Sequence, residues 1–480
     1  MRITLTRATI YVLLACVLVS AACASDIRAH DPLRLQDGDV LKAIYMYPHW
    51  WTPWKSDDAA VSTDLGQIKG LGFNTLLLDH EVSQAMDNDW GWIDRDYKLA
   101  GQQKLSILPW LQLQGADRKA LIKFWHANIK AAVNQGRQPE EDYVSFLDRD
   151  FQDAEVHYIC AYLERYGNDP SLLKVSIHGK MHPVVGIMLE TGWHNGDGFP
   201  LSFDPDTNAY FRKWMRSSYH DLAQLNKKWG TSYKTFDEID PCDRAIFNYA
   251  FADKQNMPLA VREHVRIRAH AIDDALSYIT RHVRDRYKDV VFAMESAYPL
   301  GSDNPDASVY QWNAAVESRD FQSADIVFVR TLGDTISGEV EKQQDDMRAN
   351  GKLVVTAYRL LAGASDKKSV NFALDAALSG NGIAYYNWNE QADNACAIYD
   401  KPARQAQVES MNEMYTLLCN PEKRHDLDKP SVSQPGPAAP SVVAPAPVQV
   451  PPAQATPLPS PLPAPAVPVA PATPAVPAGN

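Results

Sequence analysis

Three glutamates stand just beyond short apolar stretches of this sequence, where a buried strand would end. Glu190 follows residues 184–189, Glu295 follows residues 290–294, and Glu390 comes four residues after a similar run. Two carboxyl groups held near each other can supply the acid and the nucleophile or base that break an acetal bond. We therefore expect acid–base chemistry here, with Glu190 and Glu295 as the candidate catalytic residues.

Aromatic and polar side chains gather in the sequence near the same expected strand ends. Aromatic faces stack on the apolar C–H faces of sugar rings, so a rim of this composition suits a carbohydrate. A single tryptophan is more often part of a core, and it is the coincidence of several that favours a sugar site. The expected substrate-binding residues are Trp50, Asp79, His80, Trp110, Trp193, Tyr298, Tyr358, Trp388 and Glu390.

Eight apolar runs, separated by amphipathic stretches, would position these residues. The runs are 41–47, 73–78, 105–111, 184–189, 290–294, 326–329, 353–356 and 383–386. Strands that alternate with helices favour a parallel sheet, and right-handed crossovers close such a sheet at eight strands. We expect an α/β fold, a (β/α)8 TIM barrel with an insertion after the fourth strand. An open doubly wound sheet is the alternative, but no G-x-G-x-x-G turn follows any run.

The segment after the fourth run resembles the one that follows the fourth barrel strand in glycoside hydrolase family 42 and related retaining β-galactosidases. The residues that carry the resemblance are Phe211, Trp214, Tyr219, Leu222, Leu225, Asn226, Trp229, Gly230, Thr231, Phe236 and Ile239. In that family the strand ends in Asn-Glu and the Glu is the general acid/base, which implies this role for Glu190. Leu189 stands where the family has Asn. The resemblance implies a β-galactosidase-like hydrolase that cleaves O-glycosidic bonds of a β-linked glycan.

The second catalytic group is left open by the sequence. In the family the nucleophile is a Glu at the end of the seventh strand, where this chain has Ala357 and Tyr358. Glu295 or Glu390 could serve as the second carboxylate, or Tyr358 could attack as a phenolate favoured by Arg359. Alternatively, the protein is a catalytically inactive, glycan-binding envelope protein on the same scaffold.

Both ends of the chain differ in composition from its centre. Residues 1–24 combine Arg2 and Arg7 with an apolar run and small residues before Ser25, which predicts a signal peptide and a secreted, periplasmic or cell-envelope location. The run is too short for a membrane span, and Cys23 offers a possible lipid anchor. Residues 426–480 are rich in Pro and Ala and predict a disordered tail, while residues 25–425 form one hydrolase-like domain.

Net charge and cysteine spacing indicate which kinds of partner and cofactor to expect. The net charge is −12 without a basic stripe, so we expect no nucleic-acid partner. The aromatic rim and the family resemblance instead imply an oligo- or polysaccharide substrate. Beyond the expected signal, the cysteines are Cys160, Cys242, Cys396 and Cys419, and none of them has zinc-ligand spacing. We expect no metal and no cofactor. The cysteines could form one or two disulfides or stay buried as small apolar residues.

Overall fold

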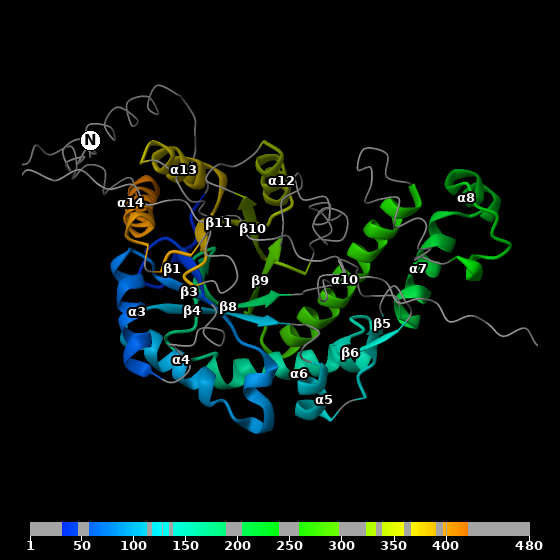
Figure 1. Cartoon of the computed structure of the whole chain (residues 1–480), viewed down its shortest axis with the longest axis horizontal. Coiled ribbons are helices and arrows are strands. Elements are labelled where there is room, and N and C mark those ends of the chain that lie inside the picture. The colour runs from blue at the N-terminus through cyan, green and yellow to red at the C-terminus, as the bar shows by residue number, and fades with distance from the viewer. Residues whose placement is uncertain are drawn as a thin grey trace, which may run out of the picture. The chain divides into compact units, whose positions relative to one another are not determined.

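The computed structural model describes residues 31–46, 57–112, 118–126, 128–133, 138–188, 204–239, 259–296, 323–332, 338–359, 366–389, 397–399 and 401–420 (Figure 1). Its centre is a barrel of eight parallel strands: β2 (Lys42–Met46), β3 (Thr75–Asp79), β4 (Ser106–Gln112), β8 (Lys180–Met188), β9 (Val291–Ser296), β10 (Ile326–Leu332), β11 (Leu353–Arg359) and β12 (Gly382–Tyr386). Neighbours pair in the order β8-β4-β3-β2-β12-β11-β10-β9, and β8 pairs with β9 to close the ring. The predicted (β/α)8 barrel is confirmed.

The barrel interior is filled by side chains. Residues that alternate along each strand point inward, and those near the middle form one buried apolar cluster. Four aromatic residues of that cluster form what we call the aromatic layer, which consists of Tyr45, Trp110, Phe328 and Tyr386. The ring of Tyr45 lies 6.1 Å from that of Trp110 and 4.4 Å from that of Tyr386. Any Cβ at Gly186 would overlap the Trp110 indole, so only glycine leaves room for this ring.

Helices surround the barrel on its outside (Figure 1). They are α3 (Asp58–Gly70), α4 (Gly91–Gln102), α5 (Arg118–Trp125), α6 (Arg149–Tyr166), α10 (Leu259–Arg286), α12 (Gly338–Ala349), α13 (Asp366–Ser379) and α14 (Pro402–Cys419), with the 3-10 helix η1 (Val82–Asn88) before α4. Local sequence fixes their ends. At the start of α3, for example, the Asp57 carboxylate accepts hydrogen bonds from the amides of Ala59 and Ala60.

Two small additions to the barrel were not predicted. Strands β1 (Arg34–Leu35) and β7 (Lys174–Ile177) extend the sheet by antiparallel pairing, with β7 against the first residues of β8. A separate hairpin consists of β5 (Ala131–Val133) and β6 (Pro139–Val144). These strands are short and contain many polar residues, so they lack the apolar run by which a buried strand is found in a sequence.

The predicted insertion after the fourth barrel strand contains α7 (Pro205–Ser218), α8 (Leu222–Trp229) and η3 (Phe236–Glu238). These elements share a small apolar cluster with Ile267 of α10, and it includes Phe211 and Leu225. The Trp229 indole donates a 2.8 Å hydrogen bond to Glu263 of α10, which also accepts one from the Tyr219 hydroxyl. Because α10 also packs on α6, this long helix joins the insertion to the barrel wall (Figure 1).

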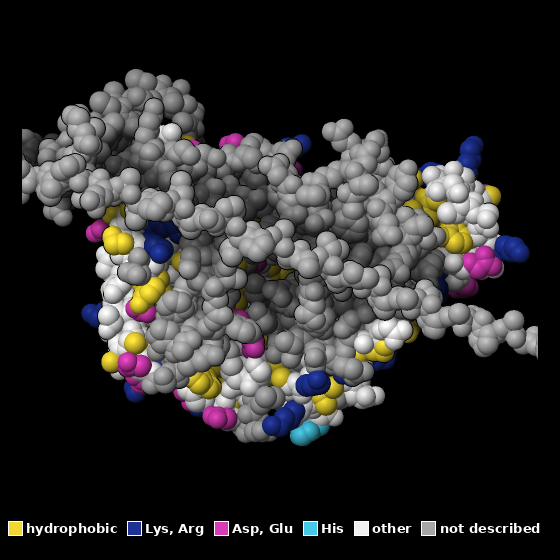
Figure 2. Space-filling view, viewed as in Figure 1, with side chains coloured by type: hydrophobic (Ala, Val, Ile, Leu, Met, Phe, Trp, Pro, Cys, Tyr) yellow, Lys and Arg dark blue, Asp and Glu magenta, His cyan; other side chains and the backbone are white. Residues whose placement is uncertain are grey.

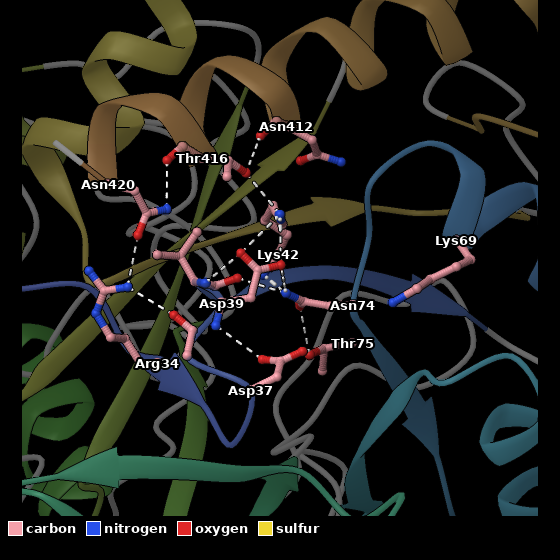
Figure 3. A network of polar contacts seen from close by, with 12 residues as sticks. Arg34, Asp37, Asp39, Lys42, Lys69, Asn74, Thr75, Asn412, Thr416 and Asn420 are labelled. Carbon is pink, nitrogen blue, oxygen red and sulfur yellow. Dashed lines mark hydrogen bonds and ion pairs between the residues drawn. The ribbon is translucent and has the colours of Figure 1, made fainter. Parts of the chain in front are cut away.

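The amino end of the barrel is tied together by a polar network around Lys42 (Figure 3). Lys42 is a buried residue, 5% exposed. Its ammonium lies 3.1 Å from the Asp39 carboxylate and donates to the Thr416 hydroxyl at 2.8 Å. Asn74 accepts from the Lys42 amide and donates to the Val40 carbonyl. Burial alone would raise the pKa of Asp39, but the charge and hydrogen bond of Lys42 outweigh it and hold that pKa below its ordinary value.

The outer surface and the ends of the chain add three observations. On the described part of the face in Figure 2, basic and acidic side chains are interspersed over the helices. Within the described ranges, no helix is long and apolar enough to span a membrane. Cys160 and Cys419 are buried, while Cys242 and Cys396 lie outside the described residues. Residues 1–30 and 421–480 also lie outside them, so the signal peptide and the tail stay predictions.

Candidate active site

The carboxyl ends of the barrel strands are where a (β/α)8 enzyme binds its substrate. Six of the residues selected from the sequence are described there or nearby, namely Asp79, His80, Trp110, Glu295, Tyr358 and Trp388. The other five, Trp50, Glu190, Trp193, Tyr298 and Glu390, lie outside the described residues.

Glu295 stands near the carboxyl end of β9. Val291 and Ala293 belong to the interior cluster, and by alternation along the strand Glu295 continues on the same inward face. It lies beside Phe328 of β10 and is 7% exposed. A carboxyl group on an interior face is unusual, because an ionised side chain is poorly solvated among apolar neighbours. Glu295 is therefore a candidate functional group at this end of the barrel.

Asp79 provides a second inward carboxyl group. It is the last residue of β3, two positions beyond the interior residue Leu77, and it pairs in register with Trp110 of β4. It is 4% exposed. Asp79 and Glu295 therefore lie on the inner face at the same end of the barrel, on strands that are separated by β4 and β8.

The aromatic layer lies next to both acids: Trp110 pairs in register with Asp79, and Phe328 pairs in register with Glu295. The Trp110 side chain is 2% exposed, and its ring lies 5.3 Å from that of Phe328. The indole Nε1 has no hydrogen-bond partner among the described residues. Tyr45, Phe328 and Tyr386, which complete the layer, were not among the residues expected to bind the substrate. The spacing of Tyr45 from Ala43 in β2, which places both on one face, was the signal that could have identified it.

His80 lies behind the strand end rather than inside the barrel. Its Nδ1 is 2.7 Å from the Tyr162 hydroxyl and its Nε2 is 3.2 Å from the Asp96 carboxylate. Its carbonyl accepts a hydrogen bond from the Tyr158 hydroxyl at 3.0 Å. The ring is fully buried, so His80 fastens the end of β3 to α4 and α6. From this position His80 can help to orient the neighbouring Asp79, and it is poorly placed to contact a sugar directly.

Tyr358 also occupies the outer face of its strand. Val355 and Ala357 belong to the interior cluster, whereas Tyr358 packs on Phe372 of α13 with ring centroids 3.6 Å apart. Complete burial raises the pKa of its hydroxyl well above the ordinary value, with a smaller contribution from Asp375. This environment opposes the phenolate that a tyrosine nucleophile would need. Of the candidates for the second catalytic group, Tyr358 is the one that the geometry favours least.

Trp388 and its neighbour Asn387 follow the last barrel strand. Both are completely buried, and the Trp388 ring contacts that of Tyr399 edge to face at 5.8 Å. The Trp388 Nε1 and both polar atoms of the Asn387 amide have no hydrogen-bond partner within the described part of the chain. Buried polar atoms are nearly always paired, so these atoms at a strand end are candidates for contact with a ligand.

The described residues contain no group of three or more His, Cys, Asp or Glu side chains arranged to hold a metal ion. Asp79 and Glu295 bring two carboxyl groups to the inner face at this end of the barrel, beside the aromatic layer.

Comparison with known proteins identifies relatives of this arrangement. Residues 140–351 match the glycoside hydrolase family 42 model, which is described as beta-galactosidase. Beta-galactosidase BgaA of Thermus sp is 22% identical over 289 residues, which are 54% of this chain and 41% of that protein. The chain thus spans less than half the length of this curated relative.

Solved structures share the barrel. The catalytic domain of beta-amylase from Paenibacillus polymyxa superposes with a TM-score of 0.56 at 11% identity, over 79% of this chain and 99% of that one. Beta-galactosidase from the psychrophilic Marinomonas ef1 gives 0.51 at 13% identity, over 82% of this chain and 62% of the other. At these identities the structures establish a common fold.

Proposed function

With a catalytic barrel like that of glycoside hydrolase family 42 as the premise, we propose that this chain is an exported hydrolase that cleaves a β-linked, galactoside-like glycan. Glu190 acts as the general acid/base and Glu295 as the second carboxylate. The observation that carries the proposal is the inward carboxyl group of Glu295, at the carboxyl end of the strand next to β8. The family match includes both strands.

Strand register supports the pairing of the two glutamates. Ile187 of β8 pairs with Met294 of β9, so Met188 is level with Glu295. Val184 belongs to the interior cluster, and residues 186, 188 and 190 share its parity along the strand. The proposal is that Glu190 continues this inward series two residues beyond Met188.

The mechanism then follows from two carboxyl groups at one barrel end. Glu190 donates its proton to the glycosidic oxygen as the bond to the anomeric carbon breaks, and the Glu295 carboxylate attacks that carbon to form a glycosyl ester. Glu190 next takes a proton from water, whose oxygen attacks the anomeric carbon and releases Glu295. This sequence retains the configuration and requires carboxyl groups about 5 Å apart, whereas an inverting route needs about 6.5 to 9.5 Å. Asp79 accepts hydrogen bonds from sugar hydroxyls.

The roles are tested with chromogenic β-galactosides and with plant or envelope polysaccharides. We expect Glu190→Gln and Glu295→Gln each to lower kcat by about 10²-fold or more, because each removes a group that acts in the transition state. Glu409→Gln, which changes an exposed glutamate of α14, is the matched control and should retain full activity. Retained activity in Glu190→Gln would remove the assigned acid/base.

The nucleophile is identified by a separate experiment. In Glu295→Ala, added azide should restore turnover and yield an α-glycosyl azide if Glu295 is the group that attacks the anomeric carbon, because azide then enters from the face opposite the β-linked leaving group. If azide instead restores Glu390→Ala, the nucleophile is Glu390. The stereochemistry of the azide product distinguishes rescue of a nucleophile from rescue of an acid/base.

A glycan-binding protein without hydrolytic activity is the second candidate. One observation favours it: β11 ends in Tyr358 and Arg359, where the family has its nucleophilic Glu, and the family match ends at residue 351, before this strand. This function predicts saturable glycan binding by calorimetry, with the ligand intact after long incubation and little loss of affinity in Glu190→Gln. Shortened oligosaccharide products would eliminate it.

Export is proposed from residues 1–24 alone. Expression in a bacterial host followed by fractionation should find the protein outside the cytoplasm with Ser25 as its first residue. A lipid anchor at Cys23 would instead place it in a membrane fraction, and Cys23→Ser would then release it. Recovery of the intact chain from the cytoplasm would contradict export.

A further inference from the structure

An extra residue interrupts the pairing of β12 with β2 at the carboxyl end of the barrel. The Ile383 amide donates to the Leu41 carbonyl, and a regular parallel ladder would next bring the amide of residue 387 to the Tyr45 carbonyl, the same number of positions further along both strands. The amide that donates there, at 2.8 Å, is instead that of Trp388. The end of β12 therefore carries one additional residue, Asn387, which makes a β-bulge.

The bulge turns the Asn387 side chain toward the barrel interior. Tyr386 points inward as a member of the aromatic layer, whereas Trp388 belongs to the apolar cluster between the strands and the helices. Side chains alternate along a strand, so counting back from Trp388 places Asn387 on the inner face. Without the extra residue it would point to the helices, as Tyr385 does, whose ring lies 6.2 Å from that of Phe372 in α13. Bulges are rare between parallel strands and often re-aim a side chain beside an active site.

The backbone of Asn387 is held in place while its side-chain amide is unused. Its carbonyl accepts a hydrogen bond from the Ile398 amide at 3.2 Å, and the carbonyl of Trp388 accepts one from the Tyr399 amide at 2.9 Å. The side chain is completely buried, yet neither Oδ1 nor Nδ2 has a hydrogen-bond partner among the described residues. A buried amide in this state is costly, and a ligand that pairs with it removes that cost.

Asn387 lies across the barrel from the proposed catalytic glutamates. In the closed ring, β12 and β8 are separated by three strands on either side, and β9 with Glu295 is next to β8. Tyr386 and Glu295 keep 8% and 7% of their surface exposed, so solvent reaches the inner face beside both strands. A sugar ring placed between them has its anomeric carbon at the glutamates. Carbons 3 and 4, on the far side of the six-membered ring, then face β12.

We infer that Asn387 binds the sugar ring through the hydroxyl groups on carbons 3 and 4. A side-chain amide presents a donor and an acceptor side by side, and two adjacent hydroxyls supply the complement: one donates to Oδ1 and the other accepts from Nδ2. Asn387 thus selects a ring with hydroxyls at both positions. It was not among the residues expected from the sequence to bind the substrate. The inference rests on the proposed function only for the location of the sugar, because a protein that binds the glycan without cleaving it would use the same contact.

The experiment is calorimetric titration of the full-length chain with free sugars, which carry no glycosidic bond to hydrolyse. Galactose, glucose and mannose are compared first, and the sugar that binds most tightly is then compared with its 2-, 3- and 4-deoxy analogues. For the parent protein we expect the 3- and 4-deoxy sugars each to bind about tenfold more weakly, because each leaves one side of the Asn387 amide unpaired.

The contact is assigned by variants at the same position. Asn387→Leu should weaken binding of the complete sugar by about tenfold or more and should no longer distinguish it from the 3- and 4-deoxy analogues, while its response to the 2-deoxy analogue stays that of the parent. Asn387→Asp keeps the acceptor and loses the donor, so it should still discriminate at one of the two hydroxyls. Asn350→Leu, at an exposed position, is the matched control and should bind as the parent does.

The pattern of losses separates a sugar contact from a damaged fold, which would weaken binding of all the sugars alike. Parent affinity in Asn387→Leu, or unchanged discrimination against the 3- and 4-deoxy analogues, would overturn the assignment, as would a parent protein that binds none of the three sugars. The hydrolase function fails by a different result, namely sugar binding by the parent without shortened products from any β-linked glycan. In that case the affinities still decide the role of Asn387.

Discussion

Buried asparagines at the two ends of the barrel differ in their hydrogen bonds. At the amino end, the Asn74 and Asn381 amides both donate and accept hydrogen bonds, and Lys42 contacts a carboxylate and a hydroxyl. At the carboxyl end, the side-chain polar atoms of Asn387 and the Nε1 of Trp388 have no partner among the described residues. Asn74 and Asn381 thus stabilise the segments that they join, whereas Asn387 adds no such bond between described residues.

The largest expected effect concerns the amino end. We expect Asn74→Ala to lower the free energy of unfolding by about 3 kcal/mol, because the buried Lys42 amide and Val40 carbonyl would both lose their partner. Chemical denaturation monitored by circular dichroism measures this. Asn350→Ala removes an exposed asparagine and should change stability by less than about 0.5 kcal/mol. If the two variants lost the same free energy of unfolding, the network around Lys42 would add nothing to the stability of the protein.

A buried carboxyl group in the helical layer gives the next largest effect. Glu155 of α6 is completely buried, and neither of its oxygens has a hydrogen-bond partner among the described residues. Burial raises its pKa well above 4.5. The folded state therefore holds this proton more tightly than the unfolded state, and stability should fall as pH rises from about 4.5 to the raised pKa.

The matching variant is Glu155→Gln, which mimics the protonated form. At neutral pH it should stabilise the protein by about 1 to 3 kcal/mol and should remove this part of the pH dependence. Glu164→Gln, an exposed position on the same helix, is the control. Urea denaturation at a series of pH values tests both variants, and a pH profile unchanged by Glu155→Gln would assign the dependence to other groups.

The smallest expected change in stability is at the carboxyl end. Asn387→Leu should leave the free energy of unfolding within about 1 kcal/mol of the parent, because no hydrogen bond to a described residue is lost. Asn381→Leu at the amino end removes bonds to the Val354 amide and the Asp31 carbonyl and should be clearly destabilising. Denaturation of the two variants side by side tests the comparison directly. The contrast between the two ends would be wrong if Asn387→Leu lost as much stability as Asn381→Leu.

The fold could be predicted from the sequence because parallel barrel strands are buried on both faces. Each of the eight apolar runs became a strand. That same burial hides which side chains face inward. In β11, Val354 and Val355 are both apolar, so the sequence does not reveal that Tyr358 points to α13 while Ala357 points inward.

The candidate site, like the fold, could be predicted only in part. The inward position of Glu295 follows from its strand end, as predicted, whereas the attachment of His80 to Asp96 and Tyr162 depends on helices that approach from outside the barrel. Long-range packing of this kind leaves no periodic signal in one sequence. The roles of Glu190, Trp50, Trp193, Tyr298 and Glu390 stay predictions.

The aromatic layer has a consequence for how the two ends of the molecule could influence each other. Tyr45, Trp110, Phe328 and Tyr386 fill the barrel lumen, so no solute can diffuse through it from base to rim. Any communication between the two ends of the barrel would therefore have to pass through displacement of the strands themselves.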